Sequence, residues 1–178
     1  MKCIHRIFTY CLMAMMSLLF SQEKIAIVPF TANGVDDATA KEITNRFSYE
    51  LSVTNRYDII EREMMDRILD EQKFQNSGCV TDTCIVKIGQ LIGVKKIVGG
   101  NVSKIENLYT LQIRLIDVKT GKILFQDMDE LEGSLINFLK ITVKNTALAL
   151  AAEAETDRSA ADDPTIYSST QTGEIVFN

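Results

Sequence analysis

The sequence predicts an α/β protein, a three-layer or two-layer sandwich in which one mixed sheet of about five strands packs against four helices. Short apolar runs typical of strands alternate with longer stretches whose apolar residues recur every three or four positions. The second half adds an antiparallel region, so the sheet is expected to be mixed. Hydrophobic residues make up 46% and charged residues 24% of the 178 residues, which is typical of a packed domain.

The first half of the chain predicts alternating strands and helices. An apolar run at 24–30 (KIAIVPF) is typical of a buried strand. Asp36 and Asp37 then provide N-cap chemistry for a helix to about Thr54, because a short carboxylate accepts hydrogen bonds from the first N–H groups of a helix. A second strand at 57–60 leads at once into a helix over about 62–74. The inward helix faces consist of Ala40, Ile43, Phe47, Leu51, Met64, Met65, Ile68 and Leu69.

The second half predicts a third helix, three strands and a final helix. Thr81 and Asp82 begin the third helix, and Gly93 ends it at a position that favours a left-handed cap. Strands follow at 96–105, 109–116 and 122–132, and a widely apolar last helix spans about 134–152. The returning strand is expected to place Ile123, Phe125 and Asp127 on one face.

Gly99 and Gly100 lie at the centre of the strand at 96–105. Glycines inside a strand usually mark a bulge or a close approach of another segment to the backbone. A phosphate-binding loop is rejected, because no helix follows the pair and no G-x-x-x-x-G-K motif is present.

The domain organisation follows from composition. Residues 1–21 are predicted to be a signal peptide, since a basic start is followed by an apolar run and by Ser21. An uncleaved membrane anchor is the alternative, although the run is shorter than the roughly 20 residues that a span needs. The α/β domain is assigned to 22–152 and a flexible linker to 153–172. The strand-like tail at 173–178 (GEIVFN) either adds to a partner's sheet or begins a further, incomplete domain.

Charge and composition exclude several classes of function. A net charge of -5 argues against nucleic-acid binding, which needs an excess of Lys and Arg. The one histidine, His5, lies in the predicted signal peptide, so the exported chain is left without Ser-His, Cys-His or His-ligated metal chemistry. We therefore expect no catalytic residue, no cofactor and no metal site, and no enzymatic activity.

Two cysteines, Cys79 and Cys84, remain in the exported chain, in the segment GCVTDTC. Export to an oxidising compartment and the turn-forming residues between them predict a disulfide. A reactive thiol or half of a metal site are the alternatives. A redox pair would normally have C-x-x-C spacing, and two thiols without further ligands do not complete a zinc site.

Acidic residues gather in the second half of the strand at 122–132, namely Asp127, Asp129, Glu130 and Glu132. Such a cluster is compatible with a pair of catalytic carboxylates or with calcium. Alternation sends neighbouring side chains to opposite faces and no glycine-containing calcium loop is present, so a solvated strand end is preferred.

Five segments, taken in order, resemble the CsgG family, which includes the curli secretion channel subunit. Its fold is shared by the lipoprotein activator of penicillin-binding proteins and resembles the N-terminal domain of TolB. The segments are 24–30 (KIAIVPF), 50–63 (ELSVTNRYDIIERE), 68–78 (ILDEQKFQNSG), 88–102 (IGQLIGVKKIVGGNV) and 111–124 (LQIRLIDVKTGKIL). Glu61 and Arg62 match the family's ER motif. The pair either fixes the strand-to-helix turn, which is the preferred interpretation, or forms a subunit contact.

The resemblance implies a non-enzymatic envelope protein, exported to the periplasm and associated with the outer membrane at most peripherally. It would act as a scaffold or accessory subunit whose partners are cell-envelope proteins, including further copies of itself. The alternative is a subunit of a curli-type secretion channel. That alternative requires paired lipid-facing strands of about 10 residues, and the sequence shows none outside the core hairpin at 109–132.

Overall fold

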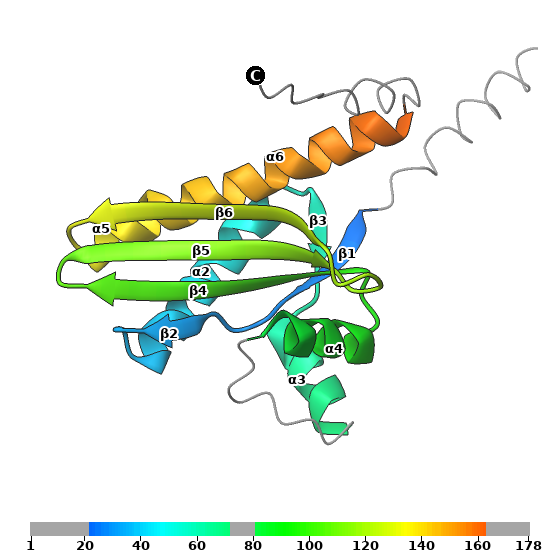
Figure 1. Ribbon diagram of the computed structural model, residues 1–178, viewed down its shortest axis with the longest axis horizontal. Coiled ribbons are helices and arrows are strands. Elements are labelled where there is room, and N and C mark those ends of the chain that lie inside the picture. Colours follow the sequence, from blue (N-terminus) through cyan, green and yellow to red (C-terminus); the bar gives the residue numbers. More distant parts are fainter. Residues whose placement is uncertain (1–21, 72–80, 163–178) are drawn as a thin grey trace, which may run out of the picture.

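The computed structural model describes residues 22–71 and 81–162 and contains a mixed six-stranded sheet (Figure 1). Its strands are β1 (Glu23–Ile27), β2 (Thr31–Asn33), β3 (Tyr57–Ile59), β4 (Lys96–Ile105), β5 (Leu108–Asp117) and β6 (Ile123–Glu132). The order is β3-β1-β4-β5-β6, and β2 pairs with β4 beyond the end of β1. β1 is parallel to β3 and β4, whereas β4, β5 and β6 are antiparallel. The predicted mixed sheet is confirmed.

Helices cover both faces of this sheet, which makes the domain a three-layer sandwich (Figure 1). The described helices are α2 (Asp37–Val53), α3 (Arg62–Glu71), α4 (Asp82–Ile92), α5 (Leu135–Lys140) and α6 (Thr142–Asp162). α2, α5 and α6 pack on one face, and α3 and α4 on the other. Ile25 and Ile27 of β1 point to the first face and Ala26 to the second, so this strand is buried on both sides. That double burial explains why the strand has a continuous apolar sequence.

The larger core lies between the sheet and the layer formed by α2, α5 and α6. Phe47 of α2 is fully buried, and its ring lies 5.3 Å from the ring of Phe30 at an interplanar angle of 63°. Phe138 of α5 is also fully buried and lies 5.2 Å from the ring of Tyr109 on β5. These aromatic pairs connect α2 to the segment between β1 and β2, and α5 to β5.

Capping residues fix the helix ends close to where the sequence places them. The Asp36 carboxylate accepts a hydrogen bond of 2.8 Å from the Thr39 N–H, so Asp36 is the N-cap of α2. Thr81 caps α4 in the same way, and Gly93 ends α4 with a left-handed φ of 80°. The predicted boundaries of both helices are therefore confirmed.

The last helix differs from its prediction in two ways. It is interrupted at Ile141 and so divides into α5 and α6, although the hydrogen bonds on either side of Ile141 continue. It also continues to Asp162, so that residues 153–162, predicted as linker, are helical. The alanine and glutamate content of this stretch favours helix, and this propensity outweighs its lack of apolar periodicity.

β6 contains a bulge that the sequence did not predict. The register pairs Leu115 with Phe125 but Ile116 with Ile123, which leaves one extra residue between them. Phe125 therefore packs on the larger core, whereas Ile123 lies on the opposite face and is 44% exposed. The prediction that Ile123 and Phe125 share one face is wrong, because the bulge reverses the alternation at that point.

Gly99 and Gly100 mark close approaches, and the pairing of β4 with β5 is regular at both positions. A Cβ on Gly100 would lie 2.6 Å from the Phe30 ring and 3.0 Å from the Gln112 carbonyl oxygen. A Cβ on Gly99 would overlap the side chain of Ile85 on α4. The two glycines thus let one helix and one aromatic ring pack directly on the backbone of β4.

In the part of the chain that the structure describes, one stretch, Leu135–Ala154, is long and apolar enough to cross a membrane by length and composition alone. Phe138, Val143, Ala147 and Leu150 are fully buried in the larger core. Packing in the core therefore accounts for much of the apolar character of this stretch.

Candidate functional site: a groove at the carboxyl ends of β1 and β3

A groove of about 370 Å³ opens where β1 and β3 end, between α2 and the turn that leads into α3. We call it the Arg62 groove. It is lined by Ile27, Asn45, Ser48, Tyr49, Ser52, Ile59, Ile60, Glu61 and Arg62. Its volume is at the lower end of the range for ligand sites, enough for a few side chains of a partner. In open α/β sheets the carboxyl ends of parallel strands are the usual place for binding.

The main chain holds the β3–α3 side of the groove. The Ile60 N–H donates to the Ile25 carbonyl at 2.9 Å, which extends the pairing of β3 with β1 by one residue. The Glu61 carbonyl then accepts the Met65 N–H at 3.0 Å, so α3 begins directly after Glu61. Backbone hydrogen bonds therefore stabilise the strand-to-helix turn and place the Arg62 side chain at its start.

α2 supplies the other side of the groove through residues that share one helix face. Asn45, Ser48, Tyr49 and Ser52 recur at three- and four-residue spacing. The Ser48 hydroxyl donates to the Thr44 carbonyl at 2.9 Å and the Ser52 hydroxyl to the Tyr49 carbonyl at 2.7 Å. Because the two serines are small and their hydroxyls bond to their own helix, they leave space above Ile59 and Ile60. Tyr49 is 60% exposed at the rim.

Arg62 is the charged group of the groove. It is half-buried, and it forms no hydrogen bond or ion pair with another described residue. Burial lowers the pKa of Arg62, and the nearby charge of Asp66 offsets only part of this shift. A guanidinium remains protonated in either case, so Arg62 offers a charge with free N–H donors.

Several other half-buried basic side chains in the described part of the chain have acidic or aromatic partners. Arg46 on α2 forms an ion pair of 2.6 Å with Glu50. Lys96 contacts Glu23 at 2.9 Å, and Lys104 lies 4.9 Å from the centre of the Tyr109 ring. Unlike these three side chains, Arg62 has N–H donors that no described residue accepts, although buried charges are usually paired.

A second hollow, of about 590 Å³, lies at the opposite, amino ends of β1 and β3. Its lining is Gln22, Glu23, Lys24, Asp58, Gly93, Val94 and Lys95. Lys24 contacts Asp58 at 3.7 Å, and Glu23 contacts Lys96. Since these charges already neutralise one another, this hollow is a weaker candidate than the Arg62 groove.

Of the residues singled out in the sequence, Glu61 and Arg62 both line the groove, and Glu61 is exposed. Their role, whether to fix the strand-to-helix turn or to form a subunit contact, stays a prediction. Sequence reasoning missed the α2 side, although an aromatic residue, Tyr49, on the polar face of a helix is a usable signal. It also gave no reason to expect that Ser48 and Ser52 face Arg62.

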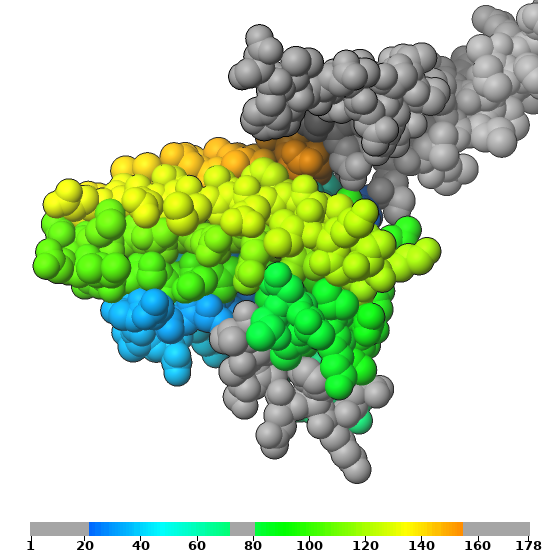
Figure 2. Space-filling model, viewed as in Figure 1, coloured from blue at the N-terminus to red at the C-terminus, as the bar shows by residue number. Residues whose placement is uncertain are grey.

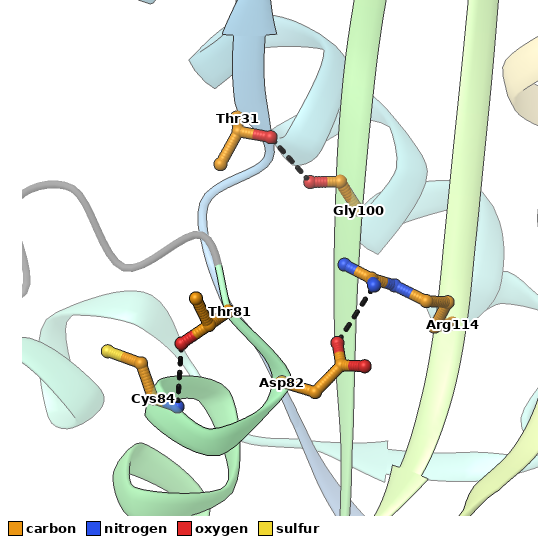
Figure 3. A network of polar contacts seen from close by, with 6 residues as sticks. All are labelled: Thr31, Thr81, Asp82, Cys84, Gly100 and Arg114. Carbon is orange, nitrogen blue, oxygen red and sulfur yellow. Dashed lines mark hydrogen bonds and ion pairs between the residues drawn. The ribbon is translucent and has the colours of Figure 1, made fainter.

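The predicted disulfide stays a prediction, because Cys79 lies outside the described residues. Cys84 lies in the first turn of α4, and its N–H donates to the Thr81 hydroxyl at 3.3 Å (Figure 3). The next residue after Thr81, Asp82, forms an ion pair of 2.8 Å with Arg114 on β5 (Figure 3). This ion pair fixes the start of α4 against the sheet beside the cysteine.

The acidic residues of β6 lie on both faces of the sheet edge and have structural partners. The carboxylates of Asp127 and Asp129 each accept a 2.9 Å hydrogen bond from the N–H of the following residue. Glu130 accepts from Thr110 at 3.4 Å and Glu132 from Asn107 at 2.8 Å. Among the described residues, no group of three or more acids, cysteines or histidines is arranged to hold a metal.

β6 is the edge strand of the sheet, and in Figure 2 its side chains form the uncovered upper front surface of the domain. An exposed edge invites pairing with another strand. We expect the double variant Asp127→Ala/Asp129→Ala to self-associate with rising concentration, since it frees two N–H donors on this edge. Size exclusion with light scattering measures the effect.

The matched control is Glu130→Ala/Glu132→Ala, which removes the same charge from the same strand but leaves both edge hydrogen bonds in place. Equal self-association of the two double variants would attribute the effect to charge alone and refute edge protection by Asp127 and Asp129.

The sheet order and its two helix layers define a mixed α/β domain that recurs in bacterial proteins of known structure. The crystal structure of lipoprotein GNA1162 from Neisseria meningitidis is similar with a TM-score of 0.55 at 16% identity, over 72% of this chain and 96% of that chain. The C-terminal domain of LpoB from Salmonella enterica has a TM-score of 0.51 at 15% identity, over 67% and 90%. At these identities the likeness establishes the fold.

The family follows from the sequence itself. The family described as "Curli production assembly/transport component CsgG" matches residues 19–107, which is half of the chain. The chain therefore belongs to the CsgG family, as the five segments predict. No curated protein matches the sequence significantly. The matched region includes α2, β3 and the start of α3, and hence both sides of the Arg62 groove.

Proposed function

We propose that this chain is an exported, non-enzymatic protein of the cell envelope that acts as a scaffold or accessory subunit through protein–protein contacts. It resides in the periplasm and associates with the outer membrane at most peripherally. Membership of a family described by assembly and transport supports this proposal, as does the fold shared with a lipoprotein.

The observation that carries the proposal is the Arg62 groove. A shallow site with an exposed tyrosine, an apolar floor and a half-buried arginine with free donors has the composition of a protein contact. Tyrosine and arginine are enriched at the energetic centres of such interfaces. The groove lining contains no histidine or cysteine and a single carboxylate, that of Glu61, so it lacks the usual groups of a catalytic site.

Photo-cross-linking in intact cells tests the proposal. Benzoylphenylalanine replaces Tyr49 at the rim of the groove or, as a control, exposed Lys119 in the β5–β6 turn. We expect a discrete adduct with an envelope protein from position 49 and none from position 119. Absence of adducts from both positions, or recovery of the chain in the cytoplasmic fraction, would contradict the proposal.

The alternative function is a subunit of a curli-type channel. It is supported by the word "transport" in the description of the family. The two functions differ in extraction and in mass. An accessory subunit is released with the soluble periplasmic fraction and gives a small species by light scattering. A channel requires detergent for extraction and gives a ring-sized species.

A further inference from the structure

We propose that the Arg62 groove binds an acidic, extended peptide segment of a partner protein, with one Asp or Glu carboxylate on Arg62 and an adjacent apolar side chain on Ile59 and Ile60. This inference rests on the proposed function and specifies the chemistry of its partner. It follows from the charge, the floor and the size of the groove.

The positive charge of Arg62 favours a carboxylate as its binding partner. The guanidinium of Arg62 is half-buried and has no hydrogen-bond acceptor among the described residues, while neighbouring Arg46 is neutralised by Glu50 at 2.6 Å. A carboxylate on Arg62 can form two parallel N–H···O bonds, a geometry that only a planar guanidinium offers. Binding would thus satisfy donors that the free domain leaves open.

The apolar floor of the groove, formed by Ile59 and Ile60, favours an apolar side chain next to that carboxylate. Ile59 and Ile60 are half-buried and belong to the margins of the two cores, so a partner side chain would extend packing that already exists. Tyr49, 60% exposed at the rim, can cover such a side chain with little loss of rotamer freedom. A volume of about 370 Å³ admits a few side chains of a segment and not a folded domain.

The surroundings favour a peptide over an anionic membrane. Glu61, Glu63 and Asp66 lie within one helical turn of Arg62, and the whole chain carries a net charge of -5. Such a surface repels an extended layer of phosphates, but it admits a single carboxylate held at short range by a half-buried guanidinium.

A peptide selection tests the inference. A library of random heptapeptides displayed on phage is selected against the chain from Gln22 to Asn178 and against its Arg62→Gln and Arg67→Gln variants. Arg67 is an exposed arginine of the same helix and serves as the matched control. The best peptide is then synthesised with blocked ends, together with a form in which its acids are replaced by amides.

We expect the wild-type chain and Arg67→Gln to enrich peptides that combine an acid with adjacent apolar residues. Arg62→Gln and the amide peptide should each weaken binding by roughly tenfold to 100-fold, the usual loss when a charge-assisted hydrogen bond is removed. An unchanged melting temperature of Arg62→Gln would show that the loss is local.

Three results would overturn the inference: no enrichment of acids, equal loss in Arg62→Gln and Arg67→Gln, or a wild-type dimer that Arg62→Gln dissociates, which would make a second copy the occupant. If cross-linking from position 49 still captures an envelope protein while the peptides show no acidic preference, the inference fails and the proposed function stands. If neither experiment detects a contact, both fail.

Discussion

Replacement of Phe47 by alanine is expected to lower the free energy of unfolding by about 3–5 kcal/mol, the range for a fully buried phenylalanine. Phe47 is 0% exposed in the larger core, where its ring meets Phe30 edge to face. The variant loses both the buried surface and the aromatic contact, and the cavity it leaves lies between α2 and the sheet. The midpoint of thermal unfolding should fall by on the order of 10 °C.

The control is Tyr49→Ala, two residues away on the same helix. Because Tyr49 is 60% exposed, this variant should change the free energy of unfolding by less than about 0.5 kcal/mol, while it removes the rim of the Arg62 groove. Similar destabilisation by the two variants would contradict the packing of α2 described above and would make Tyr49 unsuitable as a probe of the groove.

Replacement of Gly34 by alanine is expected to cost about 3 kcal/mol, through two separate effects. Gly34 follows β2 and has a φ of 74°, a conformation that costs an L-residue about 1 kcal/mol. In addition, a Cβ at this position would overlap the carbonyl oxygen of Lys104 on β4. Since main-chain atoms cannot move aside as a flexible side chain can, the substitution should disrupt the short pairing of β2 with β4.

Gly121→Ala separates the two effects. Gly121 has nearly the same φ, 71°, but no atom lies within 4 Å of the position of its Cβ. It should therefore cost only the conformational part, about 1 kcal/mol. Chemical denaturation of both variants gives the comparison. Equal losses would mean that the close contact between Gly34 and Lys104 does not exist in solution.

The order and type of the elements could be predicted from the sequence because local signals agree with the fold. Asp36, Thr81 and Gly93 act as the caps that their residue types predict, and β5 alternates buried and half-buried side chains as its sequence does. The bulge in β6 could not be predicted from the sequence. Leu124, the extra residue, is apolar like Ile123 and Phe125 on either side of it, and the register is set by pairing with β5.

Only the β3–α3 side of the candidate site could be predicted. Glu61 and Arg62 match the family motif, and the structure places both in the groove. Ser48 and Tyr49 belong to the groove because α2 packs beside the strand-to-helix turn. The spacing of residues within one helix does not predict such a contact between two segments. The acidic residues of β6 show the reverse case. Clustered in sequence, they are divided by the alternation of the strand, and they accept hydrogen bonds from N–H groups of β6 itself or from the Asn107 and Thr110 side chains.

The most direct test of a protein contact through the Arg62 groove is photo-cross-linking from position 49 in three backgrounds: wild type, Arg62→Glu and Arg67→Glu. The charge change is the same in both variants and lies on the same helix, but only Arg62 lines the groove. We predict that the adduct forms in wild type and in Arg67→Glu and is lost in Arg62→Glu. An adduct that persists in Arg62→Glu, or that disappears equally in both variants, would contradict recognition through Arg62.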